Sequence, residues 1–418
     1  MIEIIFFFIM LLVVAIFSCL IGKLPVSFQM IFIVAGMLTG WLVTGYVDIT
    51  KPPYSTIIFL IAEIALVLVL FSDASRVGLK ALNNNLSTRL LTIGLPITII
   101  LGVVIATLLF PGIPWWVAGI IGAALAPTDA ALGQIVVQNK KVPERIRKTI
   151  EVESGLNDGG SVPFLLVFIA IGLAAETFRP MGYFIQVALE QIGFGIIVGV
   201  VVGIGGGWLV LKAQDKEWIT PNFQRIAFLA IAILTFLIAD QLGGSGFIAA
   251  FIGGLALGYV VKDAGKILID FSETEGQLLN LTVFFLLGIA VLPLLLNVTW
   301  QIILYAVLSL TVIRMLPVAI SLIGTKLDFD TVLFIGWFGP RGLASIVLAL
   351  LALEELKVFP GDSTFISVVF ITVLISVFAH GFTASPLSTI YSRRINSDNL
   401  KIEDKNENKS LTPKSKRL

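Results

Sequence analysis

The sequence predicts an all-α, polytopic membrane protein, and three observations lead to that fold class. Of the 418 residues, 57% are hydrophobic and only 13% are charged. Apolar runs long enough to cross a bilayer recur from the N-terminus to about residue 392. Two of these runs are interrupted near their centres by proline, and a third contains a dense polar stretch at residues 151–161. The composition excludes a soluble domain, and the polar stretch indicates where a site should lie.

The apolar pattern divides into about thirteen spans. The first span has Glu3 where a signal peptide would have basic residues, so we interpret it as a retained span. The spans cover residues 2–22, 27–45, 56–72, 90–110, 114–136, 149–173, 181–211, 226–241, 245–261, 276–296, 300–324, 330–353 and 363–392. Together they form a transmembrane domain over 1–392, and the polar remainder, 393–418, is expected to be a disordered cytoplasmic tail.

The distribution of Lys and Arg predicts the orientation. With the N-terminus outside, 15 of the 28 basic residues fall in the connections on the cytoplasmic side, three in the outer connections and eight in the tail. Cytoplasmic connections of membrane proteins carry such an excess of basic residues. We therefore expect an odd number of spans in a cell inner or plasma membrane, with the N-terminus outside and the C-terminus in the cytoplasm.

The two remaining basic residues, Arg314 and Arg341, fall near the middle of their spans. A permanently charged guanidinium at that depth needs an anionic or dipolar partner. The acids available within or near the ends of spans are Glu63, Asp73, Asp129, Glu153, Asp158 and Asp240. The charges inside the membrane domain are therefore expected to pair with one another.

Two spans are interrupted in a matched way. Pro127 is followed by Asp129 in the fifth span, and Pro340 by Arg341 in the twelfth. Proline removes a backbone hydrogen bond and disfavours helix at the preceding residue, so each span is expected to break into two half-helices whose free ends suit an ion cavity. If spans 1–6 and 8–13 are inverted repeats, each break is the fifth span of its half, which points to a transporter's binding site.

The polar stretch is expected to be helical because it continues into an apolar run. Glu153 and Asn157 then share one face, and Ser154 and Asp158 share another, since residues four apart lie on one side of a helix. Asp158 with Asn157 is either a capping pair at a membrane edge or, as we favour, a site for an ion or a proton.

The neighbouring polar residues have alternative interpretations. Asp129 can cap the second half-helix, bind a cation, or do both. Thr128 can offer its backbone carbonyl to an ion or only cap, and Ser154 can supply an oxygen or only pack.

The other acids are interpreted as supporting residues. Glu153 is expected to neutralise an arginine, with Arg314 as the first choice and Arg341 as the second. Asp73, near the cytoplasmic end of the third span, is a candidate for an accessory role at an entrance. Glu63 is expected to satisfy a local polar network.

Several features carry no predicted chemistry. Cys19 and His380 are the only residues of their types, which excludes an intrachain disulfide, a cysteine-based metal site and a histidine cluster. Both are expected to be structural. The glycine-rich segments 205–207 and 243–246 lack the following Lys-Ser or Lys-Thr of a phosphate loop, so close helix packing is the better interpretation. No cofactor, nucleic-acid partner or enzymatic activity is expected.

Four motifs together resemble those of the monovalent cation:proton antiporters, which include the bacterial NhaP-type sodium/proton antiporters and the animal NHE exchangers. Glu153-Ser-Gly-Leu-Asn-Asp158 is similar to the family signature Glu-Ser-x-x-Asn-Asp. Pro127-Thr-Asp-Ala130, Gly243-Gly-Ser-Gly-Phe247 and Gly339-Pro-Arg-Gly342 also look like motifs of that family. They occur in the family's order, and the resemblance extends over about residues 5–390.

The resemblance implies a fold of thirteen helices with crossed, unwound spans 5 and 12. It also implies a dimerisation domain and a mobile core, and hence a homodimer with elevator-like movement. The residues implied for the shared Na⁺ and proton site are Asp158, Asp129, Ser154 and Thr128. Those implied for a stabilising cluster are Glu153, Asn157 and Arg314. The asparagine before the aspartate implies electroneutral, one-for-one exchange.

Two positions depart from the family pattern. Gly155 stands where relatives often have a larger apolar residue, and it is expected to loosen the local packing. Asp73 stands where many relatives have glutamate, which leaves its role open.

The predicted function is exchange of Na⁺ or Li⁺ for H⁺ by competition at Asp158, because an ionised carboxylate among oxygen ligands suits a small hard cation. The alternatives are a K⁺/H⁺ antiporter of the same fold, an intramembrane aspartyl protease, and a channel or transporter of organic solutes. The Gly-x-Gly-Asp element of such proteases is absent from the sequence. The few aromatic residues near the site favour a small ion over an organic solute.

Overall fold

The computed structural model describes residues 2–22, 24, 26–44, 54–77, 85–177, 180–261, 276–356 and 362–410. Within these ranges the chain is helical and contains no strand. The first half comprises α1 (Ile2–Ile21), α2 (Phe28–Thr39), η1 (Gly40–Thr44), α3 (Tyr54–Val77), α4 (Asn85–Arg89), η3 (Leu90–Gly94), α5 (Leu95–Leu109), α6 (Trp115–Ala124), α7 (Ala130–Val137) and α8 (Glu144–Thr177). The second half comprises α9 (Met181–Asp215), α10 (Pro221–Gln241), α11 (Gly246–Val260), α13 (Gln277–Leu295), α14 (Trp300–Leu310), α15 (Val312–Ser321), α16 (Phe329–Trp337), α17 (Leu343–Leu356) and α18 (Asp362–Ser410).

The helices correspond to the predicted spans. In the described part of the chain, eight helical segments are long and apolar enough to cross a membrane, and three shorter apolar helices accompany them. Each predicted span coincides with one helix or with consecutive helical pieces. This agreement confirms an all-helical, multi-pass fold, whereas the count of thirteen crossings stays a prediction.

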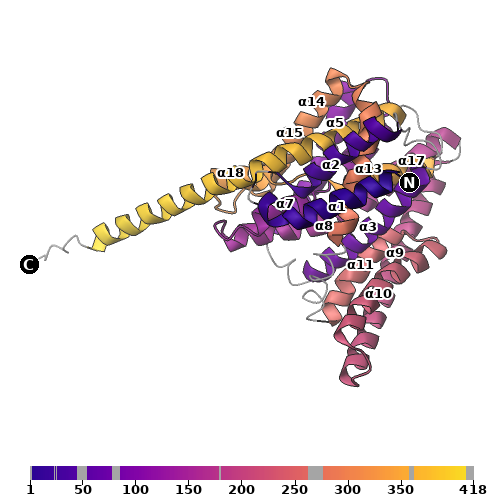
Figure 1. The fold of residues 1–418 in the computed structure, drawn as a ribbon, viewed down its shortest axis with the longest axis horizontal. Coiled ribbons are helices and arrows are strands. Elements are labelled where there is room, and N and C mark those ends of the chain that lie inside the picture. The colour runs from indigo at the N-terminus through magenta and orange to yellow at the C-terminus, as the bar shows by residue number, and fades with distance from the viewer. Residues whose placement is uncertain are drawn as a thin grey trace, which may run out of the picture.

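The C-terminal helix differs from the expected tail. The sequence predicts disorder from residue 393, but α18 continues as helix to Ser410 and extends away from the bundle (Figure 1). Its last turns contain Lys and Glu, which are good helix formers in spite of their polarity. Residues 411–418 lie outside the described residues.

Glycines allow three helices to pack closely at one side of the bundle, where α9, α10 and α11 lie together (Figure 1). A Cβ atom at Gly199 would lie 2.8 Å from the Ala249 carbonyl oxygen of α11. On the other side of α11, a Cβ at Gly254 or Gly258 would overlap backbone oxygens of α3. Small residues permit such close approach of membrane helices. Of the glycines predicted to serve packing, Gly206, Gly244 and Gly246 do so, since a Cβ there would lie within 2.8 Å of an atom of a neighbouring helix, whereas Gly205 and Gly243 have nothing within 4 Å of the Cβ position.

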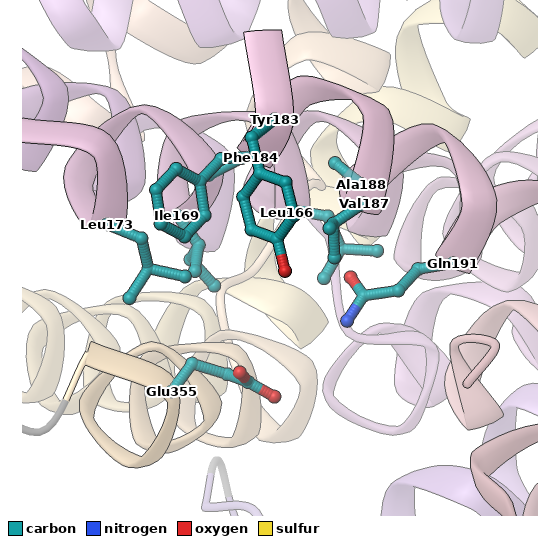
Figure 2. A pocket seen from close by; sticks show the side chains of 10 residues that line it. Leu166, Ile169, Leu173, Tyr183, Phe184, Val187, Ala188, Gln191 and Glu355 are labelled. Atoms are coloured by element: carbon teal, nitrogen blue, oxygen red, sulfur yellow. The ribbon is translucent and has the colours of Figure 1, made fainter. Parts of the chain in front are cut away.

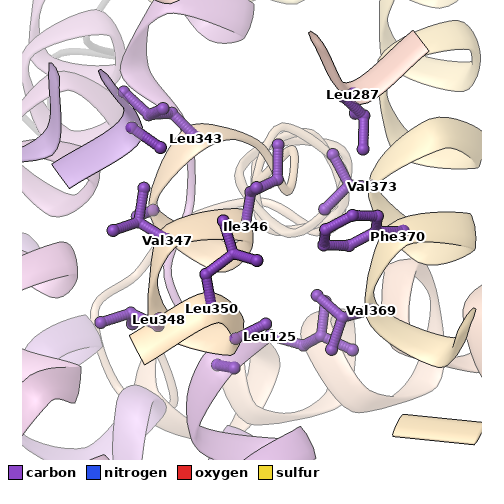
Figure 3. Close-up of a cluster of buried hydrophobic side chains, with 14 of the residues drawn as sticks. Leu125, Leu287, Leu343, Ile346, Val347, Leu348, Leu350, Val369, Phe370 and Val373 are labelled. Atoms are coloured by element: carbon purple, nitrogen blue, oxygen red, sulfur yellow. The ribbon is translucent and has the colours of Figure 1, made fainter. Parts of the chain in front are cut away.

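The half-helix α17 is embedded in the hydrophobic core. Its side chains Ile346 and Leu350 lie towards Phe370 and Val373 of α18, with Leu125 of the fifth span below them (Figure 3). Tight packing of this kind resists deformation, so α17 and α18 are expected to move as one unit. The polar site lies where this apolar packing meets the two helix breaks.

Candidate functional site

Both predicted breaks are present, and they contact each other. Helices α6 and α7 are separated by residues 125–129, and α16 and α17 by residues 338–342. The backbone N–H of Asp129 donates to the Pro340 carbonyl across the two breaks, at 2.7 Å. Four half-helix ends therefore meet at one place, which leaves free N–H and C=O groups that need partners.

Asp129 satisfies the N-terminal ends of two half-helices. Its Oδ1 accepts hydrogen bonds from the N–H groups of Ala131 (2.8 Å) and Leu132 (3.1 Å) in α7. Its Oδ2 accepts from the N–H of Leu343, at 2.9 Å, at the start of α17. A carboxylate is stabilising at helix N-termini because the helix dipoles are positive there. Of the alternatives for Asp129, the capping role is thus present, and it extends to both breaks.

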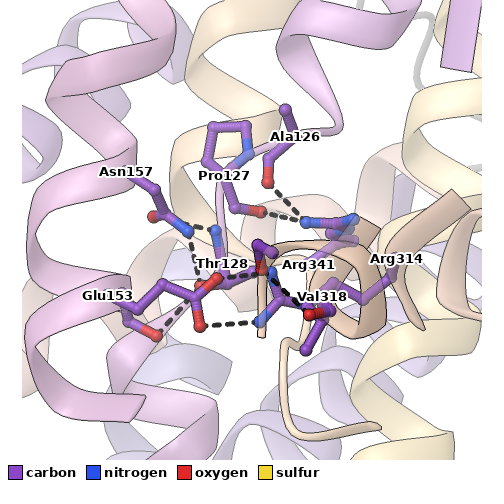
Figure 4. A network of polar contacts seen from close by, with 10 residues as sticks. Ala126, Pro127, Thr128, Glu153, Asn157, Arg314, Val318 and Arg341 are labelled. Carbon is purple, nitrogen blue, oxygen red and sulfur yellow. Dashed lines mark hydrogen bonds and ion pairs between the residues drawn. The ribbon is translucent and has the colours of Figure 1, made fainter. Parts of the chain in front are cut away.

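Arg341 satisfies the carbonyl groups that the first break frees. Its Nη1 donates to the carbonyl oxygens of Ala126 (2.5 Å) and Pro127 (2.9 Å), as Figure 4 shows. The side chain is fully buried. Arg341 was the second choice as partner for Glu153, but here it serves as the positive counterpart of a helix C-terminus.

Helix α18 supports the second break through Ser376 and Thr383, which the sequence did not single out, and through His380, for which only a structural role was expected. Ser376 Oγ accepts from the Arg341 backbone N–H at 2.6 Å. His380 Nε2 lies 2.8 Å from the carbonyl oxygen of Trp337, the last residue of α16, and Thr383 Oγ1 accepts from the Trp337 indole N–H at 3.0 Å. Ser376, His380 and Thr383 are spaced i, i+4 and i+7, so they form a polar stripe on an otherwise apolar helix. This spacing could have indicated their role from the sequence.

Glu153 and Arg314 form a buried, bidentate ion pair. Arg314 Nη1 and Nη2 donate to Glu153 Oε1 and Oε2 at 2.5 and 2.8 Å, and both residues are at most 4% exposed (Figure 4). This is the pair that the sequence named first. Because each charge is removed from water, each depends on the other for its stability.

Asn157 fastens the polar helix α8 to the first break. Its Oδ1 accepts from the backbone N–H of Thr128 at 3.2 Å, and its Nδ2 donates to Thr128 Oγ1 at 2.8 Å (Figure 4). Ser154 Oγ lies 3.0 Å from the same hydroxyl. The hydroxyls of Thr128 and Ser154 are therefore engaged with each other and with Asn157, and all three residues are buried.

Asp158 differs from the other buried acids. It is 7% exposed, and its Oδ1 has no hydrogen-bond partner among the described residues. It lies one helical turn after Ser154 on the same stripe of α8, and Ser154 contacts the break. Buried carboxylates normally have partners, so an unpartnered carboxylate oxygen beside two helix breaks needs a functional explanation.

A separate cavity of about 160 Å³ lies between α8, α9 and α17. Its walls are mainly apolar, with Glu355 on one side and Tyr183 and Gln191 on the other (Figure 2). None of the predicted site residues lines it.

The sequence of the chain is similar to those of known transporters over most of its length. A sequence model of the transmembrane sodium/hydrogen exchangers matches residues 7–389. The chain belongs to the sodium/hydrogen exchanger family. It is therefore assigned to a family of transporters, which disfavours the intramembrane protease alternative.

Individual relatives agree with this assignment. The K⁺/H⁺ antiporter NhaP of Alkalimonas amylolytica is 28% identical over 90% of this chain and 65% of its own length. The Na⁺/H⁺ antiporter ApNhaP of Aphanothece halophytica is 32% identical over 78% of this chain and 63% of its own length. The chain thus spans less than two thirds of the length of each of these two curated relatives. The sodium proton antiporter MjNhaP1 of Methanocaldococcus jannaschii has the same fold, with a TM-score of 0.74, 23% identity, and coverage of 94% of this chain and 99% of that structure.

The exchanger motif Gly339-Pro-Arg-Gly342 has a steric explanation in this structure. A Cβ atom at Gly339 would overlap the Arg314 guanidinium, and a Cβ at Gly342 would overlap the Asp129 carboxylate. Gly339 thus leaves room for the Arg314 guanidinium that pairs with Glu153, and Gly342 leaves room for the Asp129 carboxylate that links the two breaks.

The packing at Gly155 is closer than the sequence predicted. The sequence predicted looser packing at this departure from the exchanger pattern, but α3 approaches α8 closely there. A Cβ at Gly155 would lie 3.3 Å from Asp73 Cβ and 3.4 Å from Val77 Cγ2. Asp73 therefore approaches the space that a side chain at position 155 would fill. Its Oδ1 also lies 4.0 Å from Arg76 Nη1.

Proposed function

We propose that this chain is a secondary antiporter that exchanges Na⁺ or Li⁺ for H⁺, one for one and without net charge movement. The observation that carries the proposal is the buried, unpartnered Oδ1 of Asp158 beside two crossed helix breaks. An ionised carboxylate there requires a cation or a proton, because a bare charge is costly in a dry interior. Cation and proton would therefore compete for one group.

The surrounding residues have distinct roles in this proposal. Asp158 is the carrier carboxylate, and the oxygens that complete a Na⁺ site come from Asp129, Ser154 and Thr128. Hard oxygen ligands of this kind suit small cations. The residues that hold the site in shape are Glu153, Asn157, Arg314 and Arg341. Asp73 is an accessory group, supported by its close approach to α8 at Gly155.

Transport requires the site to open to each side in turn. We propose an elevator-like movement of a core that includes the crossed breaks, within a homodimer in the plasma membrane. The excess of basic residues in alternate connections supports an outer N-terminus and a cytoplasmic C-terminus.

K⁺/H⁺ exchange is the second candidate, and the name of the Alkalimonas relative supports it. Both candidates use the same carboxylate, so they differ only in the preferred ion. A titration with Na⁺, Li⁺ and K⁺ separates them.

Proton release on cation binding tests the proposal. Purified protein in weakly buffered detergent solution should release about one proton per chain when a saturating cation displaces it, and a pH-sensitive dye measures the release. Asp158→Asn should release none while its melting temperature stays close to that of the wild type. Equal proton release from Asp158→Asn and the wild type would refute competition at this carboxylate.

A further inference from the structure

A second hollow in the structure is basic and lies apart from the exchange site. It has a volume of about 430 Å³, within the range of ligand pockets. The residues that line it are Leu86, Thr88, Arg89, Arg145, Gly324, Thr325 and Lys326. They come from α4, from the first turn of α8 and from the loop between α15 and α16. The lining contains three cationic side chains and no acid.

The three cations are not neutralised by carboxylates of the described chain. Glu144, the neighbour of Arg145, pairs with Lys148 at 2.6 Å. Asp328, near Lys326, caps α16 through Thr331. By contrast with Arg145, the nearby Arg147 donates to two backbone carbonyls, those of Val142 and Val137. The positive charge at the hollow therefore remains available for an outside anion.

A hydrogen bond and the backbone conformation of the loop hold the lining of the hollow in place. Arg89 Nη1 donates to the Ile323 carbonyl at 2.8 Å, which ties α4 to the loop. Within that loop Gly324 and Lys326 both have positive φ angles, of 81° and 61°. A left-handed backbone is unfavourable for lysine, and such strain persists only where the surrounding structure imposes it. The loop thus presents Lys326 to the hollow in a fixed way.

We propose that this hollow binds a phosphate-bearing anion. Arginine and lysine are the usual partners of phosphate groups, and the N-terminal end of α8 adds positive potential. The source that the surroundings favour is the headgroup of an anionic phospholipid. Ile323 and Phe329, which flank the loop, are 68% and 73% exposed, and such apolar side chains fit the acyl region of a bilayer next to the headgroups. Basic pockets between membrane helices bind anionic headgroups in this way.

A bound anion would hold three segments of the chain together. An anion held by Arg89, Arg145 and Lys326 would connect α4, α8 and the α15–α16 loop at one end of the bundle. Helix α8 carries Asp158, so the bound anion would stabilise the helix that holds the exchange site without contacting that site.

Thermal stability of the full-length protein tests the proposal with two ligand arms. Purified protein in detergent is titrated with phosphatidylglycerol, with phosphatidylcholine as the uncharged reference, and separately with inorganic pyrophosphate as the soluble source. The pocket variant is Arg145→Gln with Lys326→Gln. The control of equal charge is Lys140→Gln with Lys141→Gln, two exposed residues that do not line the hollow.

The wild type and the control should gain several degrees in melting temperature with phosphatidylglycerol but not with phosphatidylcholine. The apparent affinity of the pocket variant for phosphatidylglycerol should fall by about 30-fold, since each cation near an anionic membrane contributes about fivefold. The same pattern with pyrophosphate would identify a soluble phosphate compound as the source. Native mass spectrometry of the wild type counts the retained lipids independently. Equal stabilisation of the pocket variant and the control, or no stabilisation of the wild type by either anion, would overturn the proposal.

Discussion

The carboxylate of Asp129, in the first helix break, accepts a hydrogen bond from the backbone N–H of Leu343, in the second, at 2.9 Å. One side chain thus caps α17 as well as α7, the half-helix that Asp129 itself precedes. Arg341 reciprocates by donating from the second break to the carbonyls of the first. Positive and negative helix ends are therefore compensated across the crossing, so a change at one break is expected to disturb the other.

Removal of Arg314 should destabilise the protein. Arg314→Ala leaves Glu153 buried without its partner, which typically costs about 3–5 kcal/mol in stability. The melting temperature of the purified protein in detergent should fall steeply. The double variant Glu153→Gln with Arg314→Gln should be less damaged than Arg314→Ala, because no unpaired buried charge remains. A wild-type melting temperature for Arg314→Ala would contradict the pair's structural role.

Gly342→Ala should disrupt the double cap of Asp129. The new Cβ would overlap that carboxylate, so the side chain or the α17 backbone must shift, at a cost of about 1–3 kcal/mol. Exchange activity should fall along with the melting temperature. Gly133→Ala in α7 is the matched control, because nothing lies within 4 Å of its Cβ position. If both alanine variants behave alike, the steric account of the motif is wrong.

His380→Ala should weaken the second break. The substitution leaves the Trp337 carbonyl without the imidazole at 2.8 Å and removes a ring that stacks on the Trp337 indole, with centroids 5.1 Å apart. The Trp337 carbonyl keeps its hydrogen bond from the Gly339 N–H, at 2.8 Å, so the expected cost of the lost contact is that of one hydrogen bond, about 0.5–1.5 kcal/mol. Phe382→Ala, on the same helix but 51% exposed, is the comparison for loss of an aromatic side chain. A smaller melting-temperature loss for His380→Ala than for Phe382→Ala would argue against this support.

Features that depend on local chemistry, or on a short list of possible partners, were predictable from the sequence. Pro127 and Pro340 predict the two breaks because proline acts on its own helix. The choice of Arg314 for Glu153 was predictable because few buried charges are available for pairing. The second cap made by Asp129, the carbonyl contacts of Arg341 and the support from His380 were not predicted. Each depends on how segments more than 40 residues apart in the chain approach one another.

The packing at Gly155 also depends on a distant segment of the chain and could not be predicted from the sequence. A glycine in a helix suggests a gap, and only the position of α3 reveals that Asp73 fills it. Asp129 also shows why a cap and an ion ligand are hard to separate from sequence, since both use the same carboxylate oxygens.

The most direct test of the exchange site measures transport in proteoliposomes with an imposed pH gradient. Internal pH is followed after addition of Na⁺, Li⁺ or K⁺, with and without a voltage clamp by valinomycin and balanced K⁺, and K⁺ itself is tested under a different clamp. Wild-type protein should collapse the gradient with Na⁺ or Li⁺ at a rate that the clamp does not change, and Asp158→Asn should not respond. Exchange by Asp158→Asn at the wild-type rate would contradict the proposed exchange at Asp158. So would the absence of any response of the wild type to all of the cations between about pH 6 and 9.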